Sequence, residues 1–367
     1  MYDPEEYINA YEQIEHGKAR LSAMRAAIEA ADANNDRPYQ FYFRIQLCKE
    51  STFYVDYMDM LVMFPELLTL ADKYPDTPTT RFNNGFTDSL DHVLWCYKWV
   101  LGACDDFYQI PMEDCEKFFE DFKRRSIAYG YNLKPYYRQK YYFYDKIDRK
   151  KADEAFYDFE RTPRDGNADC RACERNTEIR FYLNKGNLKR AEQLAKDIEN
   201  QTLRCGNDNT AWLRLKGIYL DHYMKTGNLE EALKYCRIIE RSARKQREHQ
   251  RWEDLICCYA HADIGKALKL YKEHWKELQE VREPDSAFAI CFNLSHFFKL
   301  LSENRTRSTV KLPLDTSFPL YREDGQYKIL DLYEFYYKTA EDIAKKMDAR
   351  NGVTYYQDLL EKGINLK

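Results

Sequence analysis

Apolar residues recur every three or four positions along most of the chain. Between Gly17 and Ala31, Leu21, Met24 and Ile28 lie at this spacing, which places them on one face of an amphipathic helix. Similar patterns predict two helices within 41–70 and single helices from Thr87 through Trp95 and Trp99, over 113–125, over 288–301 and over 330–347. The pattern therefore predicts a helical protein.

Two stretches interrupt the helical pattern. Pro75 and Pro78 lie in the first of them, 74–86, which is predicted to be a connecting loop. Thr87 follows this loop and can cap the next helix. The second stretch, 304–327, has no regular pattern of apolar residues and is predicted to be irregular.

Two nearly identical phrases occur within the proline-free stretch 164–283. They read Gly-Asn-Leu-Lys-Arg-Ala at 186–191 and Gly-Asn-Leu-Glu-Glu-Ala at 227–232. In a repeat of paired helices, such a glycine ends the first helix with a positive φ, the asparagine caps the second helix, and the alanine allows the two helices to pack closely. Looser copies begin at Asp148 and Asp263.

The alanines of these four phrases define a repeat. They are Ala152, Ala191, Ala232 and Ala267, and they lie 39, 41 and 35 positions apart. These spacings are slightly longer than the roughly 34 residues of the tetratricopeptide repeat (TPR). We therefore predict an all-α, TPR-like superhelical stack of antiparallel helix hairpins. The alternative is a generic helical bundle in which Gly-Asn turns recur by chance.

The predicted array has three regions that form one continuous solenoid. Residues 1–130 are expected to be a degenerate, TPR-like N-terminal helical region, 131–280 the TPR-like repeats, and 281–367 a C-terminal helical cap. At 367 residues the chain exceeds the usual size of a single core. An elongated array is consistent with this length, because each repeat packs only on its neighbours.

Composition and charge narrow the functional classes. The longest apolar stretch, 60–71, contains Pro65 and Glu66 and is shorter than the roughly 20 residues that span a bilayer. The first residues lack the basic start and apolar run of a secretory signal, so a cytoplasmic location without membrane contact is expected. The net charge of −4 disfavours nucleic acid as a partner.

Three of the eleven cysteines form a pattern with candidate chemistry. Cys170 and Cys173 precede the first helix of one repeat, and Cys205 follows its second helix. Because the segments on either side of Gly186 have similar lengths, two antiparallel helices return the chain to its starting level. The three thiols could therefore meet. Most of the cysteines are predicted to pack as small apolar residues, among them Cys96, Cys236, Cys257, Cys258 and Cys291.

Three interpretations of this cysteine cluster remain open. It could hold a structural zinc ion, form a redox-active dithiol, or consist of plain structural thiols. Structural zinc takes four ligands, and Asp169, Asp208 and His222 are candidates for the fourth, although none has the expected spacing. A zinc ion at this position would clamp the hairpin. Apart from this zinc, no cofactor is indicated.

No catalytic signature is found in the sequence. The chain contains no His-Glu-x-x-His, no Gly-x-x-x-x-Gly-Lys-Ser/Thr, no Gly-x-Gly-x-x-Gly and no Gly-x-Ser-x-Gly. The prediction is therefore a non-catalytic protein, with a motif-free enzyme as an alternative, because an active site assembled from distant residues leaves no motif.

The preferred functional hypothesis is a scaffold or adaptor that binds a protein or peptide partner in a concave groove, because the first helices of stacked hairpins line such a surface. The repeat register gives these inward-facing candidates: Tyr137, Tyr141, Asn176, Arg180, Asn184, Arg214, Asp221, Lys225, His249 and Trp252. A second hypothesis is a regulator that senses a peptide, a metal or redox state through Cys170, Cys173 and Cys205. The sequence indicates no oligomeric state.

Several phrases resemble an uncharacterised bacterial family of TPR-like proteins. They are Trp-Cys-Tyr-Lys-Trp-Val at 95–100, Thr-Pro-Arg-Asp at 162–165, Asp-Cys-Arg-Ala-Cys at 169–173, Leu-Arg-Cys at 203–205, and 335–352 with its closing Asp-Ala-Arg-Asn-Gly. The resemblance covers nearly the whole chain, and it implies a superhelical repeat fold without implying an activity. One departure concerns the cysteine cluster: relatives often place a histidine soon after the third cysteine, where this chain reads Gly-Asn-Asp-Asn-Thr at 206–210.

Overall fold

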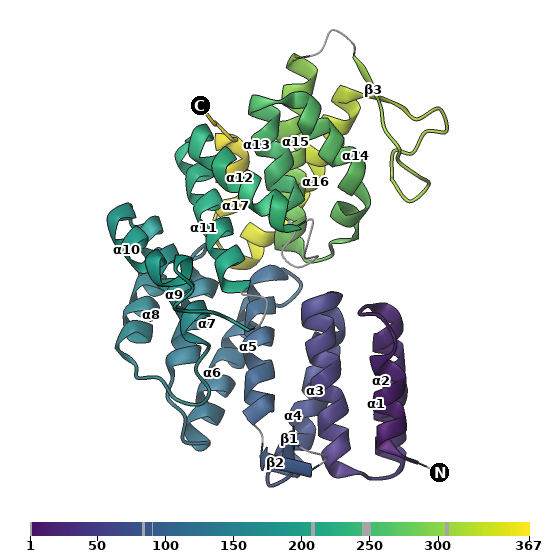
Figure 1. The fold of residues 1–367 in the computed structure, drawn as a ribbon, viewed down its shortest axis with the longest axis vertical. Helices are drawn as coiled ribbons and strands as arrows, with labels where there is room; N and C mark the ends of the chain where they lie inside the picture. The colour runs from purple at the N-terminus through teal and green to yellow at the C-terminus, as the bar shows by residue number, and fades with distance from the viewer. Residues whose placement is uncertain (1, 83–84, 90, 207–209, 244–250, 305–307) are drawn as a thin grey trace. The chain divides into compact units, whose positions relative to one another are not determined.

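The computed structural model describes residues 2–82, 85–89, 91–206, 210–243, 251–304 and 308–367 (Figure 1). These residues form seventeen helices and two small two-stranded sheets, so the prediction of an all-helical protein is confirmed in its main point. The chain divides into two compact units, 1–168 and 169–367. The boundary lies inside the segment 131–280 that the sequence groups as one repeat region.

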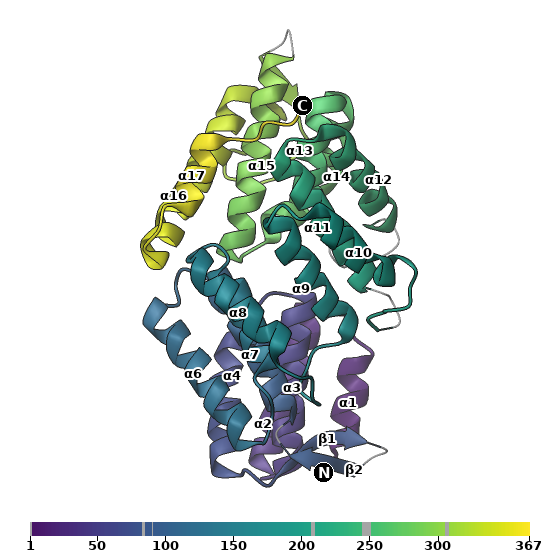
Figure 2. The same ribbon diagram turned by 90° about the vertical axis from the view of Figure 1, so that its left-hand side faces the viewer.

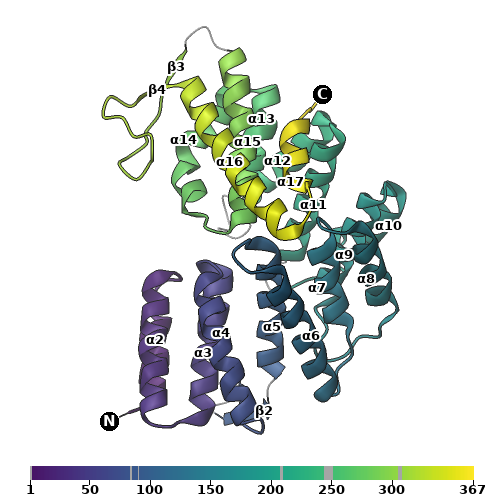
Figure 3. The same cartoon turned by 180° about the vertical axis from the view of Figure 1, so that it is seen from behind.

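The first unit contains eight helices and one β-hairpin among its described residues. They are α1 (Pro4–Glu12), α2 (Lys18–Ala33), α3 (Arg37–Tyr54), α4 (Met58–Lys73), β1 (Pro78–Phe82), β2 (Gly85–Ser89), α5 (Asp91–Asp106), α6 (Met112–Ala128), α7 (Lys134–Tyr144) and α8 (Arg149–Arg161). Helices α2, α3 and α4 pack side by side, as Figure 3 shows. Helix α5 contacts α4, α6 and α7, and α7 packs on α8.

The stretch predicted to be a loop before α5 contains a β-hairpin. Strands β1 and β2 pair antiparallel, with Pro78 opposite Ser89 and Thr80 opposite Thr87. Thr87 therefore lies in a strand, and the prediction that it caps the next helix is wrong, because α5 begins at Asp91. Several β-branched and aromatic residues of this stretch favour strands. Their preference for strands is stronger than the tendency of Thr87 to cap a helix.

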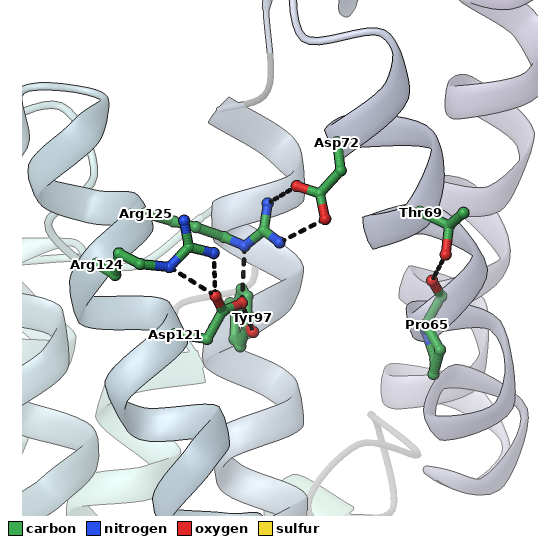
Figure 4. A network of polar contacts seen from close by, with 7 residues as sticks. All are labelled: Pro65, Thr69, Asp72, Tyr97, Asp121, Arg124 and Arg125. Atoms are coloured by element: carbon green, nitrogen blue, oxygen red, sulfur yellow. Dashed lines mark hydrogen bonds and ion pairs between the residues drawn. The ribbon is translucent and has the colours of Figure 1, made fainter.

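A polar network joins three helices of the first unit (Figure 4). The guanidinium group of Arg125, on α6, donates to both carboxylate oxygens of Asp72 on α4, at 2.6 and 2.9 Å. It also donates to Asp121 at 2.7 Å, and the hydroxyl of Tyr97 on α5 donates to the same carboxylate at 2.5 Å. The side chain of Arg125 is only 9% exposed, so its charge depends on these partners.

The second unit contains nine helices and a short β-hairpin among its described residues. They are α9 (Arg171–Asn184), α10 (Leu188–Glu199), α11 (Thr210–Thr226), α12 (Leu229–Ala243), α13 (Trp252–Ala262), α14 (Ile264–Glu280), α15 (Pro284–Glu303), β3 (Thr309–Lys311), β4 (Gln326–Lys328), α16 (Ile329–Asn351) and α17 (Tyr355–Lys362). The hairpin β3–β4 lies at the edges of the stretch predicted to be irregular. Helix α16 ends at the Asn-Gly pair of the predicted closing phrase.

Consecutive helices of the second unit pack as antiparallel pairs (Figure 2). In α9–α10, Arg175 near the start of the first helix donates to Asp197 near the end of the second, at 2.7 Å. In α13–α14, the indole of Trp252 at the start of the first helix donates to Glu277 near the end of the second, at 2.9 Å. Helices α11–α12 and α15–α16 also pair. In the first unit, α7–α8 is such a pair, because Lys134 at the start of α7 donates to carbonyl groups at the end of α8.

The turn chemistry predicted from the repeated phrases is confirmed. Gly186 and Gly227 have φ values of 71° and 77°, and Asn187 and Asn228 accept backbone N–H groups of the helices that follow them, both at 3.1 Å. Asp148 and Asp263 cap α8 and α14 in the same way. The four alanines are fully buried: Ala152, Ala191, Ala232 and Ala267 all have 0% exposure. Within the described residues, no helix is both long and apolar enough to cross a membrane.

Candidate functional site

A row of polar side chains joins the first helices of successive hairpins in the second unit. Asp221 on α11 lies 3.6 Å from the guanidinium group of Arg180 on α9 and also accepts a hydrogen bond from Arg251. Arg251, just before α13, lies 2.5 Å from Asp254. Asp254 in turn accepts a hydrogen bond of 2.8 Å from Asn293 on α15. We call these five residues the polar row.

Asp221 and Arg251, at the centre of the polar row, are kept ionised by the opposite charges next to them. Burial alone would raise the pKa of Asp221, but the positive charges of Arg251 and Arg180 outweigh that effect and lower the pKa. Burial also disfavours the charge on Arg251, yet Asp221 and Asp254 more than offset it and raise its pKa. An ionised Asp221 therefore holds both arginines against α11.

A pocket of about 310 Å³ opens beside Arg180 and Asp221. It lies between the C-terminal halves of α9 and α11, and Leu183 and Ile218 give it an apolar part. Its polar lining also includes Asn184, His222 and Lys225. Burial and the charge of Lys225 lower the pKa of His222, so this imidazole is neutral at pH 7.

Four of the ten predicted partner-binding residues line this pocket, and they are Arg180, Asn184, Asp221 and Lys225. The structure brings these four together from two neighbouring hairpins. Two other candidates lie elsewhere: Arg214 is near the start of α11, and Tyr137 is half-buried on α7 in the first unit. The remaining candidate, His249, falls outside the described residues.

Three predicted candidates are buried, so the prediction that they face an open groove is wrong. Tyr141 has 0% exposure and contacts Phe156 of its own hairpin. The amide of Asn176, 1% exposed, donates to the carbonyl oxygen of Ala211 at 2.8 Å. Trp252 stacks on His274, with 3.6 Å between ring centroids, and is 4% exposed. Each of them packs on a neighbouring helix and does not face an open groove.

His222 and Ile218 are pocket residues that sequence reasoning missed. Together with Asp221 and Lys225 they occupy positions i, i+3, i+4 and i+7 of α11, which form one helical face. This helical spacing is the feature of the sequence from which His222 and Ile218 could have been predicted. From the sequence, His222 is named only as a candidate metal ligand.

The three cysteines singled out in the sequence do meet. Cys170 is the N-cap of α9, and its sulfur accepts the backbone N–H of Cys173 at 3.3 Å. The sulfur atoms of Cys173 and Cys205 lie 3.6 Å apart, and all three Sγ atoms lie within 4.8 Å of one another. The predicted convergence of Cys170, Cys173 and Cys205 is confirmed, and we call these residues the thiol cluster.

The surroundings of the thiol cluster favour negative charge on sulfur. Hydrogen bonds from Cys170 and Cys173, together with Thr210 and the charge of Arg214, lower the pKa of Cys205. Hydrogen bonds with Cys173 and Cys205, together with burial, raise the pKa of Cys170. The guanidinium group of Arg214 lies 3.5 Å from the sulfur of Cys173. The cluster can therefore stabilise thiolate, the form of cysteine that binds metals and attacks electrophiles.

Two of the residues considered as a fourth ligand are not at the thiol cluster. His222 lies eight residues beyond Arg214 on α11, or about 12 Å along the helix axis, and it lines the pocket. Asp169 is not among the ligand atoms that converge with the three sulfurs within the described residues. Asp208 lies outside the described residues. All eleven cysteines are described and are free thiols, and the eight outside the cluster are buried, as predicted.

No family model matches the chain, and a comparison with curated proteins finds no similar sequence.

Proposed function

We propose that the protein is a non-catalytic scaffold whose helix hairpins stack in the manner of TPR repeats and bind a protein or peptide partner. The pocket between α9 and α11 is the proposed binding site. The resemblance to the bacterial TPR-like family belongs to this proposal, because it implies the same superhelical fold. The recurrent caps and buried alanines of four hairpins support the repeat, and two of these hairpins also share a glycine turn with positive φ, at Gly186 and Gly227.

The observation that carries the proposal is the composition of the pocket. Side chains from two successive hairpins converge on about 310 Å³, which is near the lower end of the range of about 300–1,000 Å³ for ligand pockets. A pocket of this size suits one or two side chains of a peptide. Its position on the first helices matches the surface on which stacked hairpins bind extended peptides.

The charges around the pocket indicate the chemistry of the partner. Among the described residues that line the pocket, Arg180 and Lys225 contribute two positive charges and Asp221 contributes one negative charge. The balance of one positive charge favours an acidic group on the bound peptide. Leu183 and Ile218 add apolar contact for the part of the peptide beside that group.

Selection from a random peptide display library on the full chain tests the proposal. We expect enrichment of peptides that carry an acidic residue next to an apolar one. Their affinity, measured by fluorescence anisotropy, should fall at least tenfold in the double variant Arg180→Ala/Lys225→Ala, which corresponds to about 1.4 kcal/mol. It should also weaken as the salt concentration rises, since screening shortens the range of the pocket charges.

A matched control removes the same charge from another surface. Lys189 and Lys196 are exposed on α10 and do not line the pocket, so Lys189→Ala/Lys196→Ala should bind the selected peptides as the wild type does. Failure to enrich any peptide, or equal affinity of the pocket variant and the wild type, would refute the proposal.

A further inference from the structure

The geometry of the thiol cluster is that of a metal site. Two sulfur ligands of a tetrahedral zinc ion lie about 3.8 Å apart, because each Zn–S bond is about 2.3 Å long. The sulfurs of Cys173 and Cys205 are 3.6 Å apart, and no pair in the cluster exceeds 4.8 Å. A disulfide needs a separation of about 2.0 Å and uses only two sulfurs. Three convergent thiols at these distances suit one shared ion better.

Local structure supplies the support that metal-bound thiolates need. The backbone N–H of Cys173 donates to the sulfur of Cys170 at 3.3 Å, and both residues lie at the N-terminus of α9, where the helix dipole favours negative charge. A zinc ion with three thiolates carries one net negative charge. The guanidinium group of Arg214, 3.5 Å from the sulfur of Cys173, balances it.

Accessibility separates this cluster from the other cysteines. Cys170, Cys173 and Cys205 are partly exposed, whereas the remaining eight cysteines are buried. A metal ion can therefore reach the three sulfurs from solvent. Within the described residues, this is the one group of three or more His, Cys, Asp or Glu side chains close enough to share an ion.

We propose that Cys170, Cys173 and Cys205 bind one zinc ion as thiolates and that the metal clamps the open end of the α9–α10 hairpin. On binding, each thiol that is still protonated loses its proton to solvent, and three Zn–S bonds form without any change in oxidation state. Softer thiolate ligands select zinc over magnesium or calcium. The clamp fixes the start of α9 to the segment that follows α10.

The zinc clamp and the peptide pocket lie at opposite ends of the same two helices. The cluster contacts the starts of α9 and α11, whereas Asn184 and Lys225 line the pocket near the ends of these helices. The metal proposal does not depend on peptide binding, and the two can fail separately. A bound ion would, however, hold the start of α9 beside Cys205, which precedes α11 in the chain.

Metal content of the purified full chain is the first test. The protein is reduced, incubated with zinc chloride, freed of unbound metal by gel filtration and analysed by mass spectrometry for zinc. We expect one zinc ion per chain in the wild type, a complete loss in Cys205→Ala, and one zinc ion in Cys291→Ala, which removes a buried thiol outside the cluster. A chelator should lower the melting temperature of the wild type but leave that of Cys205→Ala unchanged.

Cobalt titration of the wild type gives a second readout that does not require a variant to fold. Sulfur-to-cobalt charge-transfer absorption should appear and saturate at one equivalent of Co²⁺. Alkylation with peptide mapping should show Cys170, Cys173 and Cys205 protected only in the metal-loaded protein. Substoichiometric zinc together with no charge-transfer absorption would overturn the proposal. A disulfide within the cluster in protein that does not take up metal would also overturn it and identify a redox pair.

Discussion

The guanidinium group of Arg251 lies directly against Gly217 in the middle of α11. Its Nη1 atom donates to the carbonyl oxygen of Gly217 at 3.0 Å. A Cβ atom at position 217 would lie 2.9 Å from the same nitrogen, closer than such contacts normally allow. The absence of a side chain at Gly217 thus makes the room that Arg251 needs to reach Asp221, and it explains why α11 contains a glycine in its interior.

Replacing Gly217 by alanine should therefore destabilise the second unit, although alanine is the better helix former. The gain in helix propensity is about 1 kcal/mol, but the methyl group forces the Nη1 atom of Arg251 away from the carbonyl oxygen of Gly217 and breaks that hydrogen bond. We expect a net loss of about 1 kcal/mol in the free energy of unfolding, since a partly buried charge loses a hydrogen bond. Urea denaturation followed by circular dichroism measures this change.

Gly102 provides the matched control for that substitution. It lies inside α5, and no heavy atom lies within 4 Å of a Cβ built on it. Gly102→Ala should stabilise the first unit by about 0.5–1 kcal/mol. If both substitutions stabilise their units equally, Arg251 does not depend on the space at Gly217.

Asp121 is the shared acceptor in the network of the first unit (Figure 4). The variant Asp121→Asn removes the charge that accepts hydrogen bonds from Arg125 and Tyr97. We expect a loss of about 1–3 kcal/mol in the free energy of unfolding, because hydrogen bonds to charged groups are strong and the partners Arg125 and Tyr97 are buried. Chemical denaturation of the full chain should show it as a lower midpoint for the first unit.

An exposed aspartate of the same helix is the control for Asp121. Asp114 pairs with Lys117 on the surface of α6, and exposed pairs contribute little to stability. Asp114→Asn should leave the midpoint nearly unchanged. Equal effects of the two variants would mean that the network of Arg125 contributes no more than a surface ion pair.

Local signals in the sequence predict much of the second unit. Turn glycines, cap residues and small alanines act within one or two turns of helix, so Gly186 and Asn187 can be interpreted without knowledge of the remaining fold. The meeting of Cys170 and Cys205 could also be predicted, because it needs only the lengths of two helices. The spacing of the three cysteines in the sequence does not indicate which residue would be a fourth metal ligand.

Contacts between hairpins were harder to predict. The polar row depends on the rotation of each helix about its axis, and an error of one position moves a residue such as Asn176 from a groove to a helix interface. Arg251 precedes its helix and reaches back to α11 across 34 positions of sequence. No local rule links it to Gly217. The β-hairpin before α5 was missed because proline and glycine indicate a break without distinguishing a loop from a tight strand pair.

A pair of histidines should make the second unit sensitive to mild acid. The Nε2 atoms of His261 on α13 and His296 on α15 lie 2.9 Å apart, so one ring donates to the other. Burial, together with the charges of His261 and Lys299, lowers the pKa of His296 to about 4, and burial lowers the pKa of His261. Both histidines are therefore neutral in the folded protein at pH 7.

The sign of the pH dependence follows from these shifts. A histidine whose pKa is lower in the folded state binds fewer protons there than in the unfolded state, so stability is lost as the pH falls below about 6.5. From His296 alone we expect a loss of about 1–2 kcal/mol between pH 7 and pH 5. Denaturation curves at pH 7, 6 and 5 measure it. His296→Gln should reduce the loss, whereas His92→Gln, at an exposed position of α5, should not.

Gly227 should be more sensitive to substitution than Gly186, although both occupy the same position of the repeated phrase. Their φ values of 77° and 71° disfavour any L residue, which costs about 1–2 kcal/mol. Only at Gly227 does a neighbouring backbone approach: an added Cβ would lie 2.7 Å from the carbonyl oxygen of Asn365, whereas nothing lies within 4 Å at Gly186. Alanine at 227 must therefore displace this segment as well.

The segment in question is held to the α11–α12 turn by two backbone hydrogen bonds. The N–H of Lys367 donates to the carbonyl oxygen of Gly227 at 3.0 Å, and the N–H of Leu229 donates to the carbonyl oxygen of Lys367 at 3.1 Å. Gly227→Ala should accelerate hydrogen exchange at the amides of Leu229 and Lys367, while Gly186→Ala should leave both rates unchanged. The loss of stability in Gly227→Ala should exceed that in Gly186→Ala by about 1 kcal/mol or more, since two hydrogen bonds are broken. Equal losses and unchanged exchange in the two variants would show that the segment moves aside freely and does not stabilise the turn.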